Sequence, residues 1–169
     1  MKTMLGMDYD DRCVVGWIAS EKLDGIRCIW DGERLFTRNF RPINAPAWFI
    51  EKLPKEPLDG ELYLGIDTLG EMAGIVRRKQ PRDKDWQRVK YCVFDMPAEK
   101  LGFTKRMEKL ASLGVENIVP FKTITSENHL DEMFQSIISK GGEGMMLREP
   151  HAEYRDGRTD TLLKLKNKY

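Results

Sequence analysis

The sequence lacks any apolar run close to the roughly 20 residues that a membrane-spanning helix needs. Its N-terminus also lacks the long apolar segment of a secretory signal, and we therefore expect a cytoplasmic protein with no membrane partner. The cysteines Cys13, Cys28 and Cys92 are odd in number and widely spaced. This spacing argues against disulfides or a zinc site and predicts buried free thiols. Neither His129 nor His151 has a neighbour at metal-ligand spacing.

An excess of charge of one sign is also missing, because 28 basic residues nearly balance 27 acidic ones and leave a net charge of +1. A chain of 169 residues, 41% hydrophobic and 33% charged, is typical of one globular domain, and we expect residues 1–169 to form it. The basic residues are nevertheless clustered in two zones, which fit either a nucleic-acid backbone or an ordinary solvated surface. The zones are Arg77, Arg78, Lys79, Arg82, Lys84, Arg88 and Lys90, and then Lys164, Lys166 and Lys168.

The pattern of apolar residues and turn signals predicts strands at residues 17–20, 26–30, 34–38, 58–64, 89–95, 144–148 and 162–166. The pair Asp31-Gly32 favours a hairpin between the second and third of these strands. Helices are expected at residues 45–52 with Asn44 as the cap, at 69–77, at 103–113, and from Ser126 or Asn128 to Lys140. Strands outnumber helices and adjoin in hairpins, which predicts an α+β fold of antiparallel sheets flanked by helices.

A short charged motif at residues 21–27 is the strongest candidate for chemistry. Lys22 lies in an apolar stretch, Asp24-Gly25 follows as a turn, and Arg27 comes five positions after the lysine. A lysine amine becomes a nucleophile when desolvation or a nearby cation lowers its pKa. The motif suits such a lysine beside a phosphate-binding arginine, although a β-turn with solvated charges has the same pattern.

Five further segments follow the lysine in order, and each supplies a group that nucleotide chemistry needs. Glu61 lies inside an apolar strand, where a carboxylate is costly unless it is paired. Glu143 stands among glycines, which let the backbone approach a ligand closely. Lys164 and Lys166 alternate with leucines, so both ammonium groups share one strand face. The segments are Thr37-Arg38-Asn39, Leu58-Asp59-Gly60-Glu61-Leu62-Tyr63, Tyr91-Cys92-Val93-Phe94-Asp95, residues 141–148 and residues 162–166.

This ordered set resembles the nucleotidyltransferase motifs of ATP-dependent DNA ligases, a superfamily that also contains RNA ligases and mRNA capping enzymes. Residues 75–81, with Trp86 and Val93-Phe94-Asp95, look most like the compact bacterial and phage enzymes. The resemblance covers positions 17 to 166 and implies the ligase nucleotidyltransferase (ATP-grasp-like) fold.

The resemblance implies a catalytic role for Lys22, which would attack the α-phosphate of ATP and carry AMP as a phosphoramidate. Lys164 and Lys166 match the pair that grips this phosphate. The remaining nucleotide contacts are implied in the same way. Arg38 and Glu61 would hold the ribose, Phe94 would stack on adenine, and Ser20 would read the adenine edge. Glu21, beside the lysine, is a further candidate for binding the nucleotide.

The metal and the nucleic acid are implied by the same resemblance. Glu143 matches a ligand of a divalent cation, for which Mg²⁺ is the candidate. Asp24 would orient either the lysine or the metal. Arg27 matches the residue that engages the 5′-phosphate of a DNA nick. The basic zone at residues 77–90, called the basic tract below, is the candidate DNA surface, with a core made of Arg77, Arg78, Lys79 and Arg82.

We accordingly expect a monomeric DNA ligase catalytic domain that joins nicked double-stranded DNA in repair, replication or recombination. Minimal ligases continue into a C-terminal OB-fold domain that helps in self-adenylylation. Nothing after Lys166 corresponds to such a domain, so we expect weak overall sealing by this chain. Two alternatives stay open: an RNA ligase or capping-type nucleotidyltransferase, and a non-catalytic module that binds nucleotide or DNA.

Overall fold

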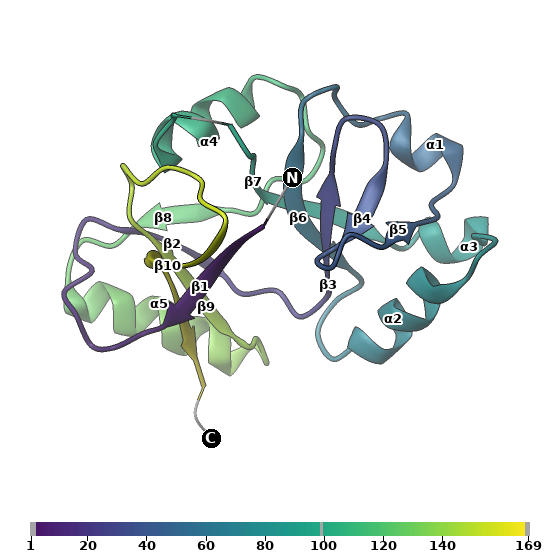
Figure 1. Cartoon of the computed structure of the whole chain (residues 1–169). Helices are drawn as coiled ribbons and strands as arrows, with labels where there is room; N and C mark the ends of the chain where they lie inside the picture. Colours follow the sequence, from purple (N-terminus) through teal and green to yellow (C-terminus); the bar gives the residue numbers. More distant parts are fainter. Residues whose placement is uncertain (1–2, 99, 168–169) are drawn as a thin grey trace. The chain divides into compact units, whose positions relative to one another are not determined.

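The computed structural model describes residues 3–98 and 100–167, and Lys168 of the C-terminal basic zone lies outside them. The described chain divides into two compact units (Figure 1). The first unit takes its residues from Met1–Leu23, Glu99–Lys105 and Val119–Tyr169, and the second from Asp24–Ala98 and Arg106–Ile118. Each unit contains one sheet, and among the described residues no helix has the length and apolar character to cross a membrane.

The sheet of the first unit has the strand order β1-β10-β9-β2-β8. Its strands are β1 (Met4–Asp8), β2 (Ile18–Glu21), β8 (Phe121–Thr123), β9 (Gly144–Arg148) and β10 (Gly157–Lys166). All neighbours pair antiparallel except β1 and β10, which run parallel with a register shift between Gly6 and Met7. The expectation of antiparallel sheets is therefore correct for every pair but this one.

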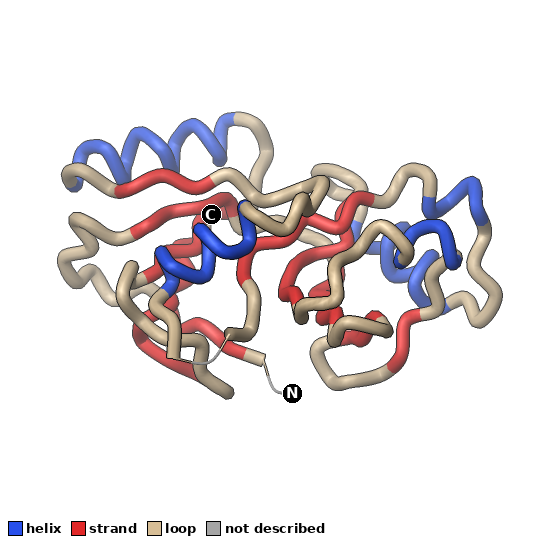
Figure 2. Tube along the Cα trace, turned by 90° about the horizontal axis from the view of Figure 1, so that it is seen from above, coloured by secondary structure: helices blue, strands red, loops and turns tan. Residues whose placement is uncertain are grey.

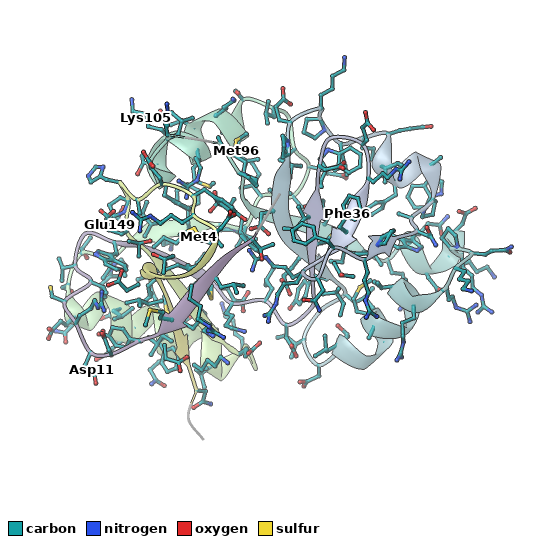
Figure 3. All side chains as sticks on the ribbon, viewed as in Figure 1. Met4, Asp11, Phe36, Met96, Lys105 and Glu149 are labelled. Carbon is teal, nitrogen blue, oxygen red and sulfur yellow. The ribbon has the colours of Figure 1, made fainter. Side chains whose placement is uncertain are left out.

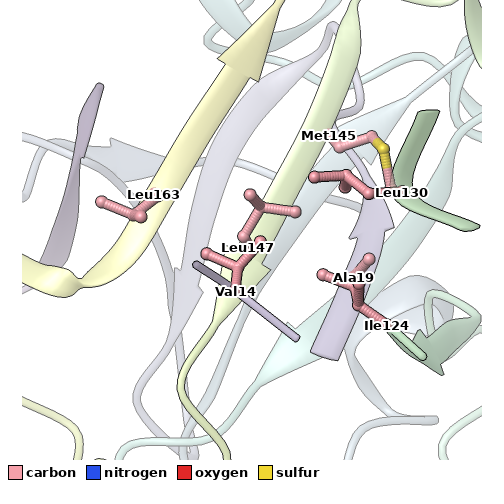
Figure 4. Packing of buried hydrophobic residues seen from close by; sticks show 7 residues of the cluster. All are labelled: Val14, Ala19, Ile124, Leu130, Met145, Leu147 and Leu163. Carbon is pink, nitrogen blue, oxygen red and sulfur yellow. The ribbon is translucent and has the colours of Figure 1, made fainter. Parts of the chain in front are cut away.

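The core of the first unit lies between its sheet and helix α5 (Glu127–Ser139), which runs beside the strands in Figure 2. Figure 4 shows the buried side chains that meet there, with Leu130 of the helix against Met145 and Leu147 of β9. Ser126 is the residue that caps the helix, because its hydroxyl oxygen accepts a hydrogen bond from the amide of His129 at 3.0 Å.

The sheet of the second unit has the order β5-β4-β3-β6-β7 and is antiparallel throughout. Its strands are β3 (Ile26–Trp30), β4 (Leu35–Thr37), β5 (Pro42–Ile43), β6 (Leu58–Tyr63) and β7 (Lys90–Asp95). The helices are α1 (Ala47–Ile50), α2 (Leu69–Arg77) and α3 (Asp83–Trp86), while α4 (Phe103–Ala111) begins in the first unit and ends in the second. The hairpin at Asp31-Gly32 is confirmed as β3–β4.

Three expectations are wrong in detail. The helix expected at residues 45–52 begins only at Ala47, because the Asn44 amide donates to the carbonyl oxygen of Lys79 at 3.1 Å and does not cap it. The helix expected at residues 103–113 ends earlier, at Ala111. Of the three thiols expected to be buried, only Cys28 is fully buried, and Cys13 is exposed.

Candidate functional site

Lys22 lies directly after β2 and faces the start of β9. Its amide donates to the carbonyl oxygen of Gly144 at 2.8 Å, and its Nζ donates to Glu143 Oε1 at 2.8 Å. The pairing of β2 with β9 thus brings together two side chains 121 residues apart in the sequence. Both are partly buried, with 22% and 33% of their side chains exposed, so the ion pair stands at an accessible surface.

Ser20 and Glu21 are the last two residues of β2 and pair with Met146 and Met145 of β9. Both side chains are half-buried. They therefore lie on the same strand end as Lys22, as the sequence predicts.

Lys164 of β10 adds a second cation to this part of the first unit. Its Nζ lies 3.9 Å from Asp8 Oδ1, across the parallel pair of β1 and β10. Burial, and then repulsion by Lys166, with smaller contributions from Arg158 and Lys22, hold the pKa of Lys164 below its ordinary value. The part of this shift that comes from Lys166, Arg158 and Lys22 places further positive charges near Lys164, and an anion would be stabilised there.

In the second unit Arg27 and Asp59 form a paired site on neighbouring strands. Arg27 Nε donates to Asp59 Oδ1 at 2.7 Å and Nη2 donates to Oδ2, a two-point contact across β3 and β6. The Asp59 side chain is 1% exposed and that of Arg27 is 18% exposed. A carboxylate this deeply buried is stabilised by its guanidinium partner, which it holds in one orientation.

Glu61 and Gly25 fix the turn that follows Lys22. The amide of Gly25 donates to Glu61 Oε2 at 3.1 Å, which supplies a partner for the carboxylate inside β6. A Cβ atom at position 25 would lie 2.2 Å from the carbonyl oxygen of Leu62. Only glycine permits this approach, which explains the Asp-Gly pair of the motif.

Phe94 is half-buried near the end of β7, and the Arg27 guanidinium carbon lies 5.2 Å from its ring centroid. This is a cation–π distance, so Phe94 contacts the arginine that Asp59 holds. Arg38 is exposed in the turn after β4, and Asp24 is half-buried just before β3. For neither side chain do the described residues supply a hydrogen bond or ion pair.

The basic tract begins at Arg77, the last residue of α2 in the second unit. All four residues of its core, Arg77, Arg78, Lys79 and Arg82, are exposed. Asn44 holds the backbone of this tract through its bond to the Lys79 carbonyl oxygen. Arg88, which we counted with the tract, instead pairs with Glu71 at 2.7 Å and Asp85 at 3.7 Å.

The structure thus groups the expected residues in two sets. The first unit brings together Lys22, Glu143 and Lys164, and the second brings together Arg27, Glu61 and Phe94. Within residues 3–98 and 100–167 no three histidine, cysteine or carboxylate side chains form a ready metal cluster.

Sequence reasoning quoted Asp59 and Asp95 without giving them a role, and it missed Arg106. A signal was available for Asp59, because a carboxylate within an apolar strand needs a partner there just as Glu61 does. For Arg106, an arginine among the turns of an amphipathic helix, the sequence carries no such signal.

Comparisons with known proteins give the family of the chain. The model of the family described as ATP dependent DNA ligase domain matches residues 12–166. A DNA ligase of Haemophilus influenzae is 32% identical, and the match covers 96% of this chain and 62% of that protein. A solved Lig E DNA ligase is 37% identical with a TM-score of 0.91, covering 99% of this chain and 69% of the other.

More distant structures support the fold alone. The Chlorella virus DNA ligase–adenylate has a TM-score of 0.81 at 23% identity, covering 98% of this chain and 67% of the other. The bacteriophage T7 ATP-dependent DNA ligase in complex with ATP has a TM-score of 0.75 at 15% identity, covering 99% and 69%.

The fold is that of a nucleotidyltransferase domain of the ligase type. The chain belongs to the ATP-dependent DNA ligase family. It spans 62% of the length of the Haemophilus influenzae relative.

Proposed function

We propose that this chain is the adenylating part of an ATP-dependent DNA ligase, with Lys22 as the nucleophile. The lone pair of Lys22 Nζ attacks the α-phosphorus of ATP, and a nitrogen–phosphorus bond forms. The bond from that phosphorus to the bridging oxygen breaks, pyrophosphate leaves with the electron pair, and the amine gives up its proton. The product is AMP joined to Lys22 as a phosphoramidate.

The contact between Lys22 Nζ and Glu143 Oε1 at 2.8 Å carries this proposal. Attack needs a neutral amine, and the carboxylate holds Nζ in place until its proton is lost. Because both groups are partly exposed, solvent can take the proton and a nucleotide can reach the amine. Glu143 also stands among the glycines of residues 141–144, and Lys164 lies on β10, the strand that pairs with β9.

Lys164 and Lys166 would neutralise the α-phosphate in this reaction. Phosphoryl transfer depends mainly on positioning and charge neutralisation, which a pair of lysines on one strand can supply. We assign the adenine edge to Ser20 and Glu21, the ribose to Arg38 and Glu61, and the adenine face to Phe94.

Two carboxylates are the candidates for holding a divalent metal. Glu143 is a partly exposed carboxylate, and Asp24 is a second one without a partner among the described residues. Hard oxygen ligands of this kind suit Mg²⁺, so we assign these two residues to it. The ion would add positive charge next to the phosphates of ATP.

We further propose that AMP passes to the 5′-phosphate at a nick in double-stranded DNA, after which the 3′-hydroxyl attacks and AMP is released. Arg27 would engage the 5′-phosphate, and the exposed tract Arg77, Arg78, Lys79 and Arg82 would contact the DNA backbone. We expect the whole enzyme to be a monomer with an OB-fold domain in addition, and to serve DNA repair, replication or recombination.

The test is an intact-mass measurement after incubation with ATP and Mg²⁺. Wild-type protein should gain the mass of AMP, and Lys22→Ala should not. Lys109→Ala, which removes an exposed lysine on α4, is the matched control and should be labelled normally. Absence of labelling in the wild type, or persistent labelling in Lys22→Ala, would refute the proposal.

The same assay separates the alternatives. An RNA ligase or capping-type enzyme would accept GTP or prefer nicked RNA, and a non-catalytic module would bind ATP without a mass gain. The match to the DNA ligase family favours ATP and nicked DNA over these outcomes.

A further inference from the structure

Strands β6 and β7 lose their regular register at Phe94. Asp59 of β6 pairs with Asp95 of β7, and the next residue, Gly60, pairs with Val93. The register therefore shifts by one residue at Phe94, which is the pattern of a β-bulge. Bulges change the direction in which a side chain points, and they need support because the ladder is interrupted.

Gly60 makes this bulge possible. A Cβ atom at position 60 would lie 2.5 Å from the carbonyl oxygen of Cys92 and 3.0 Å from the Cα of Val93. Because both obstacles are backbone atoms, no side-chain movement could relieve the contact. The glycine of the Asp-Gly-Glu segment thus permits the close approach of the two strands beside Phe94.

Arg106 of α4 holds the other side of the bulge through Asp95. Its Nε donates to Asp95 Oδ1 at 2.8 Å and its Nη2 donates to Oδ2 at 3.2 Å. The amide of Met96, a residue labelled in Figure 3, donates to the same Oδ1 at 2.7 Å. Arg106 and Asp95 are 1% and 0% exposed, so this pair is fully withdrawn from water.

Two guanidinium–carboxylate pairs therefore flank Phe94. Asp59, the bulge partner of Asp95, holds Arg27, and Arg27 lies against the Phe94 ring. Asp95 holds Arg106 on the neighbouring side. A buried pair is poor evidence of net stability, since apolar residues often replace it at no loss. Its fixed two-point geometry instead favours a role in orientation.

We propose that Arg106 is a positioning residue for the nucleotide, acting through Asp95 to fix the β-bulge that orients Phe94. This inference rests on the proposed function, in which Phe94 stacks on adenine. Arg106 does not contact the nucleotide in this account. Arg106 instead determines the position of the Phe94 ring.

The test is a double-mutant cycle on ATP affinity. Arg106→Lys keeps the positive charge but loses the two-point contact with Asp95. The double variant Asp95→Asn with Arg106→Met removes both charges together, and it serves as the second probe if the single variant does not fold. Each is made with Phe94 present and in a Phe94→Ala background, with Lys109→Met, an exposed site on the same helix, as control. Urea unfolding confirms that every variant is folded at the assay temperature.

With Phe94 present, we expect the Arg106 variants to weaken ATP binding about tenfold. This is less than the ~100-fold loss of catalytic rate that a shift of about 1 Å in a bound substrate can cause. In the Phe94→Ala background the same changes should alter ATP affinity less than about twofold. The reason is that Arg106 acts on the nucleotide only through the position of the Phe94 ring, which this background lacks. Binding of inorganic triphosphate, which has no base, should not change. Lys109→Met should match the wild type.

Equal losses in both backgrounds, or equal losses for ATP and inorganic triphosphate, would mean that Arg106 only supports the fold and would overturn the inference. An unchanged ATP affinity in the Arg106 variants would overturn it as well. Failure of the wild type to bind ATP would refute the proposed function itself, and the two failures are therefore distinguishable.

Discussion

Removing the charge of Asp59 tests how much the ion pair between Asp59 and Arg27 contributes to the stability of the fold. Asp59→Asn keeps the size of the side chain but leaves the Arg27 guanidinium without its anionic partner on β6. Breaking a buried ion pair by changing one partner costs about 3–5 kcal/mol. Arg27 retains 18% exposure and some hydration, so we place the loss at the lower end, about 3 kcal/mol.

Urea unfolding followed by tryptophan fluorescence would measure this loss. With a slope of about 1–3 kcal/mol/M, a loss of ~3 kcal/mol lowers the midpoint by roughly 1–3 M. Asp67→Asn is the matched control, because Asp67 is exposed and has a positive φ of 58° that asparagine tolerates. A midpoint for Asp59→Asn within the error of this control would refute the claim that the pair orders Arg27.

Three further predictions concern other parts of the chain. Gly25→Ala should lower stability by about 1–3 kcal/mol in urea unfolding, because its Cβ would lie 2.2 Å from a backbone oxygen; unchanged stability would contradict the geometry. The pKa of Lys164, which is lowered mainly by burial, should rise when bound AMP supplies negative charge beside it. ¹³C NMR of labelled lysine would measure this pKa, and an equal or lower value with AMP bound would contradict contact between Lys164 and the phosphate. In a thiol titration at pH 8, the exposed Cys13 should react fast, and Cys92 should react slowly because burial raises its pKa to about 11. The buried Cys28 should react only after unfolding, and a fast reaction of Cys28 in the folded protein would contradict its burial.

Local sequence patterns predicted two elements of the second unit with their bounds, although the short β5 and α3 have no counterpart among the expected elements. The strand at Ile26–Trp30 and the helix at Leu69–Arg77 have the expected bounds, because each has clear periodicity and clear end signals. Ser126 and Asn128 were equal candidates for a cap, and only the hydrogen bond to His129 distinguishes them.

Long-range pairing could not be predicted in the same way. The strand Met4–Asp8 has Gly6 at its centre, which is unfavourable in a strand, and its parallel partner β10 lies about 150 residues later in the sequence. The first half of β10 reads Gly-Arg-Thr-Asp-Thr, which is polar and looks like a loop. Its place in the sheet depends on tertiary contacts that local patterns do not contain.

The candidate site shows the same limit. Motif order identified Lys22 and Glu143, and the strand pairing explains why they meet. The support given by Asp59 and by the Arg106–Asp95 pair depends on which buried groups face each other across strands and helices. Such partners become visible only when the chain is folded.

The central claim is that the Lys22 nitrogen becomes bonded to AMP, and mapping the adenylate tests it most directly. Wild-type protein would be incubated with ATP and Mg²⁺, digested, and sequenced by tandem mass spectrometry. We predict AMP on the peptide that contains Lys22, through a bond that is labile in acid and stable in base, as a phosphoramidate is. An adenylate found on another residue, or none on Lys22 while ATP is bound, would contradict the account.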